Sequence, residues 1–154
     1  MNNETIHSGG WLKEYDALTE AAILMRQKYS YAPYSHYCVG AALLGEDGKI
    51  YTGCNIENAS YPVGICAERT AFAKAVSEGC RKFKALLIAG AASDKRGSDL
   101  CAPCGMCRQT IREFCGEDFP IIMIKADGAG AVTDSRIYKL KELLPESFGP
   151  ENLL

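Results

Sequence analysis

The sequence predicts an α/β fold, a three-layer α/β/α sandwich around a mixed five-stranded sheet. Segments with apolar residues at helical spacing alternate along the chain with short apolar runs that are typical of strands. Their order is a helix, a hairpin, and then alternating helices and strands, which packs helices against a sheet. The chain of 154 residues is long enough for one domain with its own core, which we expect over residues 11–154.

The sequence of the N-terminal region predicts a flexible tail followed by an amphipathic helix. Residues 1–10 are polar and show no periodicity, so we expect the tail there. From residue 11 to about residue 29, apolar side chains recur at helical spacing. They are Leu12, Tyr15, Leu18, Ala22 and Met25. Pro33 disfavours helical geometry at the residue before it, and this predicts the end of the helix.

A hairpin and then alternating helices and strands make up the rest of the chain. Residues 37–44 and 50–55 are largely apolar, and Glu46, Asp47 and Gly48 between them favour a tight turn. The later elements are predicted from apolar spacing and from glycine and proline positions. They are a helix over 66–78 capped by Gly79, a strand over 83–89, a loop over 90–99, a helix over 103–116, a strand over 120–125, a short fifth strand around Val132, and a last helical turn or two over 138–144.

The composition argues against several classes of partner. The chain has 17 basic and 19 acidic residues and a net charge of −2, whereas binding to a phosphate backbone usually needs a basic surface. No apolar run reaches the length of a membrane span, and the N-terminus lacks the apolar core of a signal peptide. The eight cysteines therefore fit metal binding in a reducing compartment better than disulfides. We expect a soluble cytoplasmic protein that binds neither nucleic acid nor membrane.

Three cysteines and one glutamate give the strongest chemical signal. Cys104 and Cys107 have the two-residue separation with which one segment presents two sulfurs to one ion, and Cys66 can supply a third. A catalytic zinc ion with three protein ligands leaves its fourth position to water. Glu68 follows Cys66 by two residues, so it could transfer protons for that water without binding the metal.

Spacing alone leaves three interpretations of these cysteines open. The first is catalytic zinc with Glu68 beside it. The second is structural zinc, which needs a fourth ligand, with Cys101 as the nearest additional donor. The third is a redox pair of Cys104 and Cys107, or inert thiols, which would leave residues 66–68 unexplained. The other cysteines are expected to be small buried or partly buried thiols and not ligands. They are Cys38, Cys54, Cys80 and Cys115.

Asn55 and Glu57 close the second predicted strand. Residues two apart on an extended segment point to the same face, so an amide and a carboxylate there could hold vicinal hydroxyl groups. From these residues alone, a solvated strand end is the simpler interpretation.

The cysteine segments resemble the zinc site of the cytidine deaminase family, in its small three-cysteine type. The resemblance rests on residues 66–68 and 103–109, and it extends from about residue 14 to the C-terminus. Further stretches match in the same order. They are 31–35, 39–42, 53–59, 143–145 and Phe148. Several separated motifs in one order make the resemblance specific.

For the metal site, the resemblance implies one zinc ion held by Cys66, Cys104 and Cys107. Glu68 would be the proton shuttle. Three thiolates around Zn²⁺ carry a net charge of about −1, which weakens the acidifying effect of the metal on water. The resemblance gives Arg69 the role of donating hydrogen bonds to the sulfurs, which would offset that charge.

For the substrate, the resemblance implies that Asn55 and Glu57 bind the sugar hydroxyls of a nucleoside. Tyr37 stands where the family commonly has phenylalanine near the ligand. The other implied contacts are Tyr61, the backbone of Ala67 and Cys104, and Phe148. Phe148 would reach the nucleoside of a neighbouring subunit in a homotetramer with shared active sites.

The implied activity is zinc-dependent hydrolytic deamination of cytidine and deoxycytidine to uridine and deoxyuridine, with release of ammonia, in pyrimidine salvage. A deaminase of a modified cytosine nucleoside would share the zinc site, but would not need Asn55 and Glu57. A polynucleotide-editing deaminase is disfavoured by the acidic balance of the chain. A structural zinc protein that binds a partner would have no use for Glu68.

Overall fold

The computed structural model describes residues 15–92 and 100–154. The expected tail over residues 1–10, the start of the first predicted helix at residues 11–14, and residues 93–99 of the predicted loop lie outside the described residues. No helix in the described part of the chain combines the length and the apolar character that crossing a membrane requires.

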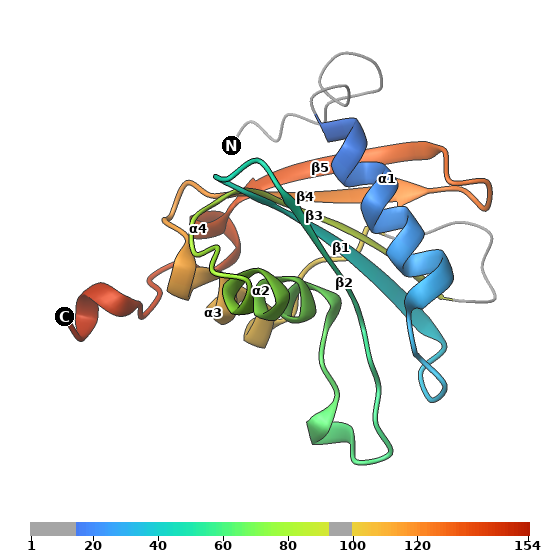
Figure 1. Ribbon diagram of the computed structural model, residues 1–154, viewed down its shortest axis with the longest axis horizontal. Coiled ribbons are helices and arrows are strands. Elements are labelled where there is room, and N and C mark those ends of the chain that lie inside the picture. Colours follow the sequence, from blue (N-terminus) through green and yellow to red (C-terminus); the bar gives the residue numbers. More distant parts are fainter. Residues whose placement is uncertain (1–14, 93–99) are drawn as a thin grey trace.

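One five-stranded mixed sheet forms the centre of the fold (Figure 1). Its strands are β1 (Tyr37–Gly45), β2 (Ile50–Cys54), β3 (Phe83–Ala92), β4 (Pro120–Ala126) and β5 (Val132–Lys139), in the spatial order β2-β1-β3-β4-β5. Of the four strand pairs described in this sheet, β3–β4 is parallel and the others are antiparallel. A parallel pair needs a crossover connection, and α3 (Gly105–Phe114) lies between these two strands in the sequence.

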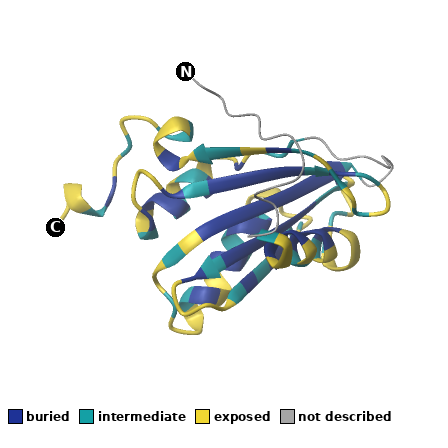
Figure 2. Cartoon of the chain, turned by 90° about the horizontal axis from the view of Figure 1, so that it is seen from above, coloured by how far each residue is buried: buried dark blue, intermediate teal, exposed yellow. Residues whose placement is uncertain are grey.

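Helices cover both faces of the sheet and confirm the predicted three layers (Figure 1). On one face, α1 (Asp16–Leu24) packs through Leu18, Ala22 and Ile23 against a buried apolar cluster from β1, β3 and β4. On the opposite face, α2 (Ala67–Ser77) and α3 share the other cluster, which includes Phe72 and Ile111. Buried residues accordingly run along the central strands (Figure 2). The helix pair on this second face carries all three cysteines of the candidate metal site.

Most predicted elements are confirmed, with end positions shifted by a few residues. The hairpin joins β1 to β2 in an antiparallel register, and Gly79 ends α2 with a positive φ of 95°, a geometry that favours glycine. The first helix is not uniform. It is α-helical only to Leu24 and then continues as the π-helical turn η2 (Met25–Tyr29).

Two predictions about strand length were wrong. The strand predicted over 83–89 continues to Ala92, because β1 pairs with it as far as Tyr37↔Ala92. The fifth strand, predicted to be short and centred on Val132, is the eight-residue β5, which pairs with β4 from Ala126↔Val132 to Pro120↔Lys139. It includes Tyr138, where the sequence predicts the start of the last helix, so α4 is only Leu140–Leu143. β5 is an edge strand with many polar side chains, and its pairing partner, rather than its composition, makes it a strand.

Candidate active site

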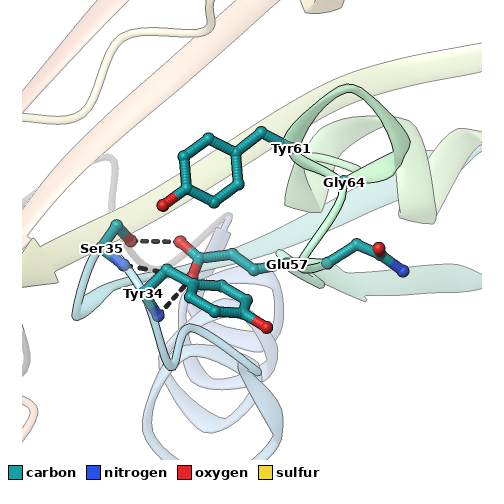
Figure 3. Close-up of a pocket in the computed structure, with 6 residues that line it drawn as sticks. Tyr34, Ser35, Glu57, Tyr61 and Gly64 are labelled. Atoms are coloured by element: carbon teal, nitrogen blue, oxygen red, sulfur yellow. Dashed lines mark hydrogen bonds between the residues drawn. The ribbon is translucent and has the colours of Figure 1, made fainter.

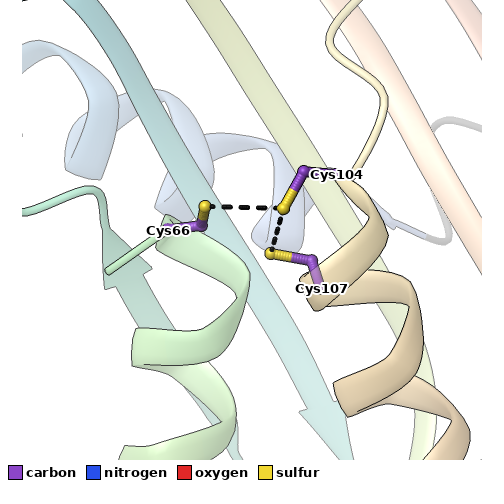
Figure 4. Close-up of side chains that lie close together, drawn as sticks. All are labelled: Cys66, Cys104 and Cys107. Carbon is purple, nitrogen blue, oxygen red and sulfur yellow. Dashed lines mark hydrogen bonds between the residues drawn. The ribbon is translucent and has the colours of Figure 1, made fainter. Parts of the chain in front are cut away.

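The three predicted cysteines meet where the N-termini of α2 and α3 converge (Figure 4). The Sγ atom of Cys104 lies 3.8 Å from that of Cys66 and 3.6 Å from that of Cys107. The three sulfurs all lie within 4.8 Å of one another. Tetrahedral zinc with Zn–S bonds of about 2.3 Å would hold neighbouring sulfurs about 3.8 Å apart. The cluster therefore has the dimensions of a zinc–thiolate site.

Helix starts place these sulfurs. Cys66 and Cys104 are the N-cap residues of α2 and α3, and both have extended backbone geometry. Cys107 lies in the first turn of α3. Unpaired N–H groups and the positive end of the helix dipole stabilise thiolates at such positions.

The cluster favours ionised sulfur before any metal is considered. A hydrogen bond from Cys107, supported by Cys104 and Arg69 and opposed by burial, lowers the pKa of Cys66 to about 5. The same hydrogen bond, together with burial, raises the pKa of Cys107. At neutral pH one thiolate is thus held by a neighbouring thiol. Metal binding would release the remaining protons, because zinc binds thiolates.

Cys101 does not join this cluster. Among the described residues, only Cys66, Cys104 and Cys107 bring metal-ligating atoms together. Cys101 lies against Gly90 and Tyr37 instead: a Cβ added to Gly90 would stand 2.8 Å from the Cys101 sulfur and 3.2 Å from Cε1 of Tyr37. Burial raises the pKa of Cys101 to about 11, so its thiol stays protonated at neutral pH. The structural-zinc interpretation with Cys101 as the fourth ligand therefore has no support in the geometry.

Glu68 lies in the first turn of α2 and is only 4% exposed. Burial, with a contribution from the charge of Cys66, raises its pKa to about 7. A carboxyl group that titrates near neutral pH can both accept and release a proton, whereas an exposed glutamate is almost fully ionised.

Arg69 follows on the same helix and faces the sulfurs. Burial lowers the pKa of its guanidinium, but hydrogen bonds to Cys66 and Cys107 more than offset this and hold the pKa above its usual value. Nη2 also donates to the carbonyl of Gly64 at 3.3 Å, while the buried Nε has no hydrogen-bond partner. The cation therefore lies where it can offset the charge of the thiolates.

A pocket of about 380 Å³ opens beside Glu57 (Figure 3). The carboxylate of Glu57 accepts hydrogen bonds from the backbone N–H groups of Tyr34 (2.9 Å) and Ser35 (3.2 Å) and from the Ser35 hydroxyl. The bond from the Ser35 hydroxyl is the main cause that lowers the pKa of Glu57. The rings of Tyr34 and Tyr61, with centroids 5.8 Å apart, form an aromatic wall of the pocket. The pocket thus combines an ionised acceptor with apolar surface.

The Asn55 side chain is largely occupied by the protein itself. Its oxygen accepts from the N–H of Val39 (2.9 Å) and from the Ser30 hydroxyl, and its nitrogen donates to the carbonyl of Tyr37 (2.8 Å). One N–H of the amide remains for another partner. Asn55 therefore joins the end of β2 to the start of β1, a structural role that the sequence analysis missed.

The other predicted substrate contacts are distributed around the site. Ala67 is fully buried in the first turn of α2, and Tyr37 is half-buried beside Cys101 at the start of β1. Tyr61 is 74% exposed at the pocket edge. Phe148 is 59% exposed on the C-terminal segment and does not line this pocket.

Comparison with known proteins identifies the family. Residues 12–123 match the family described as the cytidine and deoxycytidylate deaminase zinc-binding region. The cytidine deaminase of Sporosarcina psychrophila is 47% identical over 127 residues, which cover 82% of this chain and 86% of that protein. The chain belongs to the cytidine and deoxycytidylate deaminase family.

Other members of the cytidine deaminase family agree in sequence and in fold. A probable cytidine deaminase of Dictyostelium discoideum is 44% identical over 128 residues, which cover 83% of this chain and 80% of that protein. The crystal structure of cytidine deaminase from Burkholderia pseudomallei has a TM-score of 0.73 and 39% identity, and the comparison covers 87% of this chain and 98% of that one.

Zinc is the metal that this deaminase site takes. The matched family region is defined by zinc binding, and the sulfur spacing in the cluster fits that ion. The alternatives of a redox pair or inert thiols, which the spacing left open, do not account for Cys66 within the cluster or for buried Glu68 beside it.

Two residues of the pocket beside Glu57 were not predicted from the sequence. Tyr34 and Ser35 supply the hydrogen bonds that hold Glu57, whereas the sequence predicts for residues 31–35 only the end of a helix and a stretch that matches the family. The available signal was a hydroxyl residue that follows Pro33 and Tyr34 in a loop before a strand.

Proposed function

We propose that this protein is a zinc-dependent cytidine deaminase that converts cytidine and deoxycytidine to uridine and deoxyuridine and releases ammonia, in pyrimidine salvage. The observation that carries the proposal is the buried carboxyl of Glu68 beside a cluster of three thiols of zinc-site dimensions. A metal-activated water and an adjacent acid–base group are what hydrolytic deamination requires. The names of the relatives described above support the choice of substrate.

Cys66, Cys104 and Cys107 would hold the zinc ion. Zinc held there supplies the Lewis acidity that makes water nucleophilic near neutral pH. Arg69 limits the negative charge that three thiolates bring to the ion, and the N-termini of α2 and α3 act in the same direction.

Glu68 carries protons through the reaction. Its carboxylate accepts a proton from the attacking water and delivers it to N3 of the pyrimidine ring as the oxygen adds at C4. It then transfers the second proton of that water to the departing amino group. Water is consumed and ammonia leaves, so one residue serves both transfers without net change in its own charge. A pKa near 7 suits a group that both accepts and donates.

Glu57 is proposed to accept hydrogen bonds from the sugar hydroxyls. Its carboxylate is held ionised by Ser35 and faces the pocket. Asn55 can add only the one N–H that its own structural bonds leave. Tyr61 and Tyr37 would contact the nucleoside through their rings, and the backbone of Ala67 and Cys104 would contact the edge of the base.

We also propose a cytoplasmic homotetramer with shared active sites, in which Phe148 of one subunit completes the site of another. The support is a set of large apolar side chains that the surface leaves exposed. Exposed fractions are 74% for Tyr61, 64% for Val63, 64% for Met106 and 59% for Phe148. Large apolar side chains with this much exposure are what a subunit interface would cover.

The proposal is tested on the full-length protein purified without added metal. Elemental analysis should give close to one zinc ion per chain, and a spectrophotometric assay should show loss of cytidine absorbance as uridine forms. Zinc-loaded protein that leaves both cytidine and deoxycytidine unchanged would refute the proposed activity. Activity without any bound zinc would refute the proposed mechanism.

A further inference from the structure

Arg108 makes contacts that the proposed chemistry does not use. It lies one turn into α3, and its side chain folds back toward the start of the helix. Nε donates to the carbonyl of Pro103 at 2.8 Å, and Nη1 donates to the carbonyl of Leu143 at 2.6 Å. One guanidinium thus joins the segment before Cys104 to the last residue of α4.

The bond to Pro103 acts on the peptide that leads into Cys104. The carbonyl of Pro103 belongs to the rigid plane that also contains the N–H and Cα of Cys104, so holding that oxygen orients the cysteine backbone. Pro103 is fully buried, and it has no N–H of its own to anchor it. Cys104 itself is exposed. Packing therefore restrains Cys104 less than it restrains the buried Cys107.

The bond to Leu143 keeps the guanidinium in place. Leu143 is half-buried at the end of α4, and its carbonyl is one of the helix-end acceptors that cations stabilise. Hydrogen bonds from a charged donor are stronger than neutral ones, and two of them in a planar fork fix both partners.

We propose that Arg108 is a positioning residue for the zinc ligand Cys104, and that its fork between Pro103 and Leu143 limits the rate at which zinc leaves the site. The inference rests on the zinc site that underlies the proposed function. Its test, however, measures metal release and not deamination, so the role of Arg108 and the proposed function can fail separately.

Arg112 provides a matched control on the same helix. It is 7% exposed and lies one turn beyond Arg108. Its Nε donates to Ser147 Oγ at 2.9 Å, and its guanidinium pairs with Glu151. Arg112 therefore anchors the C-terminal segment to α3 as Arg108 does, but its hydrogen bonds do not reach the segment that carries Cys104.

The experiment compares zinc-loaded wild type, Arg108→Met, Arg108→Lys and Arg112→Met. Zinc release into excess chelator is followed at constant pH with a zinc-sensitive dye, and the thermal midpoint is recorded for each protein. Arg108→Met should release zinc about 10–100-fold faster, the usual effect of losing a group that orients a metal ligand. Arg108→Lys should be intermediate, because an ammonium group can reach only one of the two carbonyls.

Arg112→Met should have a lower thermal midpoint but release zinc within about twofold of wild type, because its contacts are independent of Cys104. Equal acceleration in Arg112→Met and Arg108→Met would overturn the proposal, since general loosening of α3 would then explain both. Release from both Arg108 variants at the wild-type rate would also overturn it. If Arg108→Met does not fold, Arg108→Lys decides, and a wild-type release rate in that variant refutes the role.

Discussion

The carboxyl groups of Glu68 and Glu57 occupy opposite environments in this protein. Burial in the first turn of α2 raises the pKa of Glu68 to about 7. Hydrogen bonds from Ser35 and Tyr34 lower the pKa of Glu57 at the exposed pocket. A group that titrates near neutral pH can carry protons, while one held ionised is a constant acceptor. At the scale of single residues, the environment thus separates the two proposed roles.

Replacing Glu68 should separate metal binding from turnover. Glu68→Ala should retain zinc, since the residue is not one of the three clustered ligands, but kcat should fall by roughly 10²–10⁴-fold because the proton carrier is lost. Binding of cytidine should be affected much less. Steady-state kinetics with elemental analysis measures both, and Glu78→Ala, an exposed glutamate beyond the end of the same helix, is the control. A kcat within tenfold of wild type in the zinc-loaded variant would assign the proton transfer elsewhere.

Replacing Glu57 should affect recognition of the sugar and not of the base. Glu57→Gln removes a charged acceptor, so kcat/KM for cytidine should fall roughly 10- to 150-fold, the range for a lost hydrogen bond to a charged group. The much slower reaction of free cytosine should not change. The pKa of Glu57 lies below its usual value, so the wild-type carboxylate stays ionised when the pH is lowered from 8 to 5. The ratio of kcat/KM for cytidine between wild type and Glu57→Gln should therefore stay constant over that range. Equal losses for cytidine and cytosine would argue against the sugar contact.

At the scale of elements, the position of α2 depends on its close approach to β2. A Cβ added to Gly53 would stand 2.5 Å from the backbone nitrogen of Ala71 and closer still to the carbonyl of Ala67. Both partners are backbone atoms, so no side chain can move aside. The bare backbone of Gly53 therefore sets how closely the helix start that carries Cys66 and Glu68 approaches the sheet.

The variant Gly53→Ala should push α2 away from the sheet. We expect a loss of stability on the order of 1–3 kcal/mol, as for other overpacked sites, together with weaker zinc retention because Cys66 moves with the helix. Gly116→Ala is the control, since a Cβ there meets nothing within 4 Å. Thermal denaturation and zinc content after dialysis measure the two effects. Unchanged stability would mean that helix and sheet can separate without cost.

At the scale of the whole molecule, the zinc cluster and Phe148 occupy different surroundings. The zinc cluster and Glu68 belong to two helices packed on one core, whereas Phe148 lies exposed on the C-terminal segment. Gln109 donates to the carbonyl of Phe148 at 3.0 Å, and Arg112 holds the neighbouring Ser147. An exposed aromatic residue on an anchored segment is suited to contact a partner, because little ordering remains to be done on binding.

Mixed assemblies test whether Phe148 acts between subunits. Phe148→Ala alone should raise KM for cytidine, and Glu68→Ala alone should be nearly inactive. When both variants are produced together, some sites should combine Glu68 of one chain with Phe148 of its neighbour and recover wild-type KM. Each variant produced alone is the control. Absence of recovery in assemblies shown to contain both chains would refute the shared site, and a monomer by sedimentation would refute the tetramer.

The sequence by itself determined the fold class and the metal cluster. Apolar spacing predicted the helices and most strands, and the cysteines were recognisable because each lies at a predicted helix start, where local chain geometry directs the sulfur. Glu68 could be predicted for the same reason, being two residues from Cys66. Local patterns thus located each half of the site, while Cys66 and Cys104 lie 38 residues apart and it was the family resemblance that assigned them to one ion.

Only the tertiary structure decided how distant segments use their polar groups. Asn55 binds residues of β1, Cys101 turns to Gly90 and Tyr37 rather than to the metal cluster, and Arg108 reaches Leu143. The full length of β5 likewise follows from pairing with β4. The hydrogen bond from Arg108 to Leu143 spans 35 residues of sequence, and the contact between Tyr37 and Cys101 spans more. Such contacts depend on which surfaces the folded core brings together, and no local pattern encodes that choice.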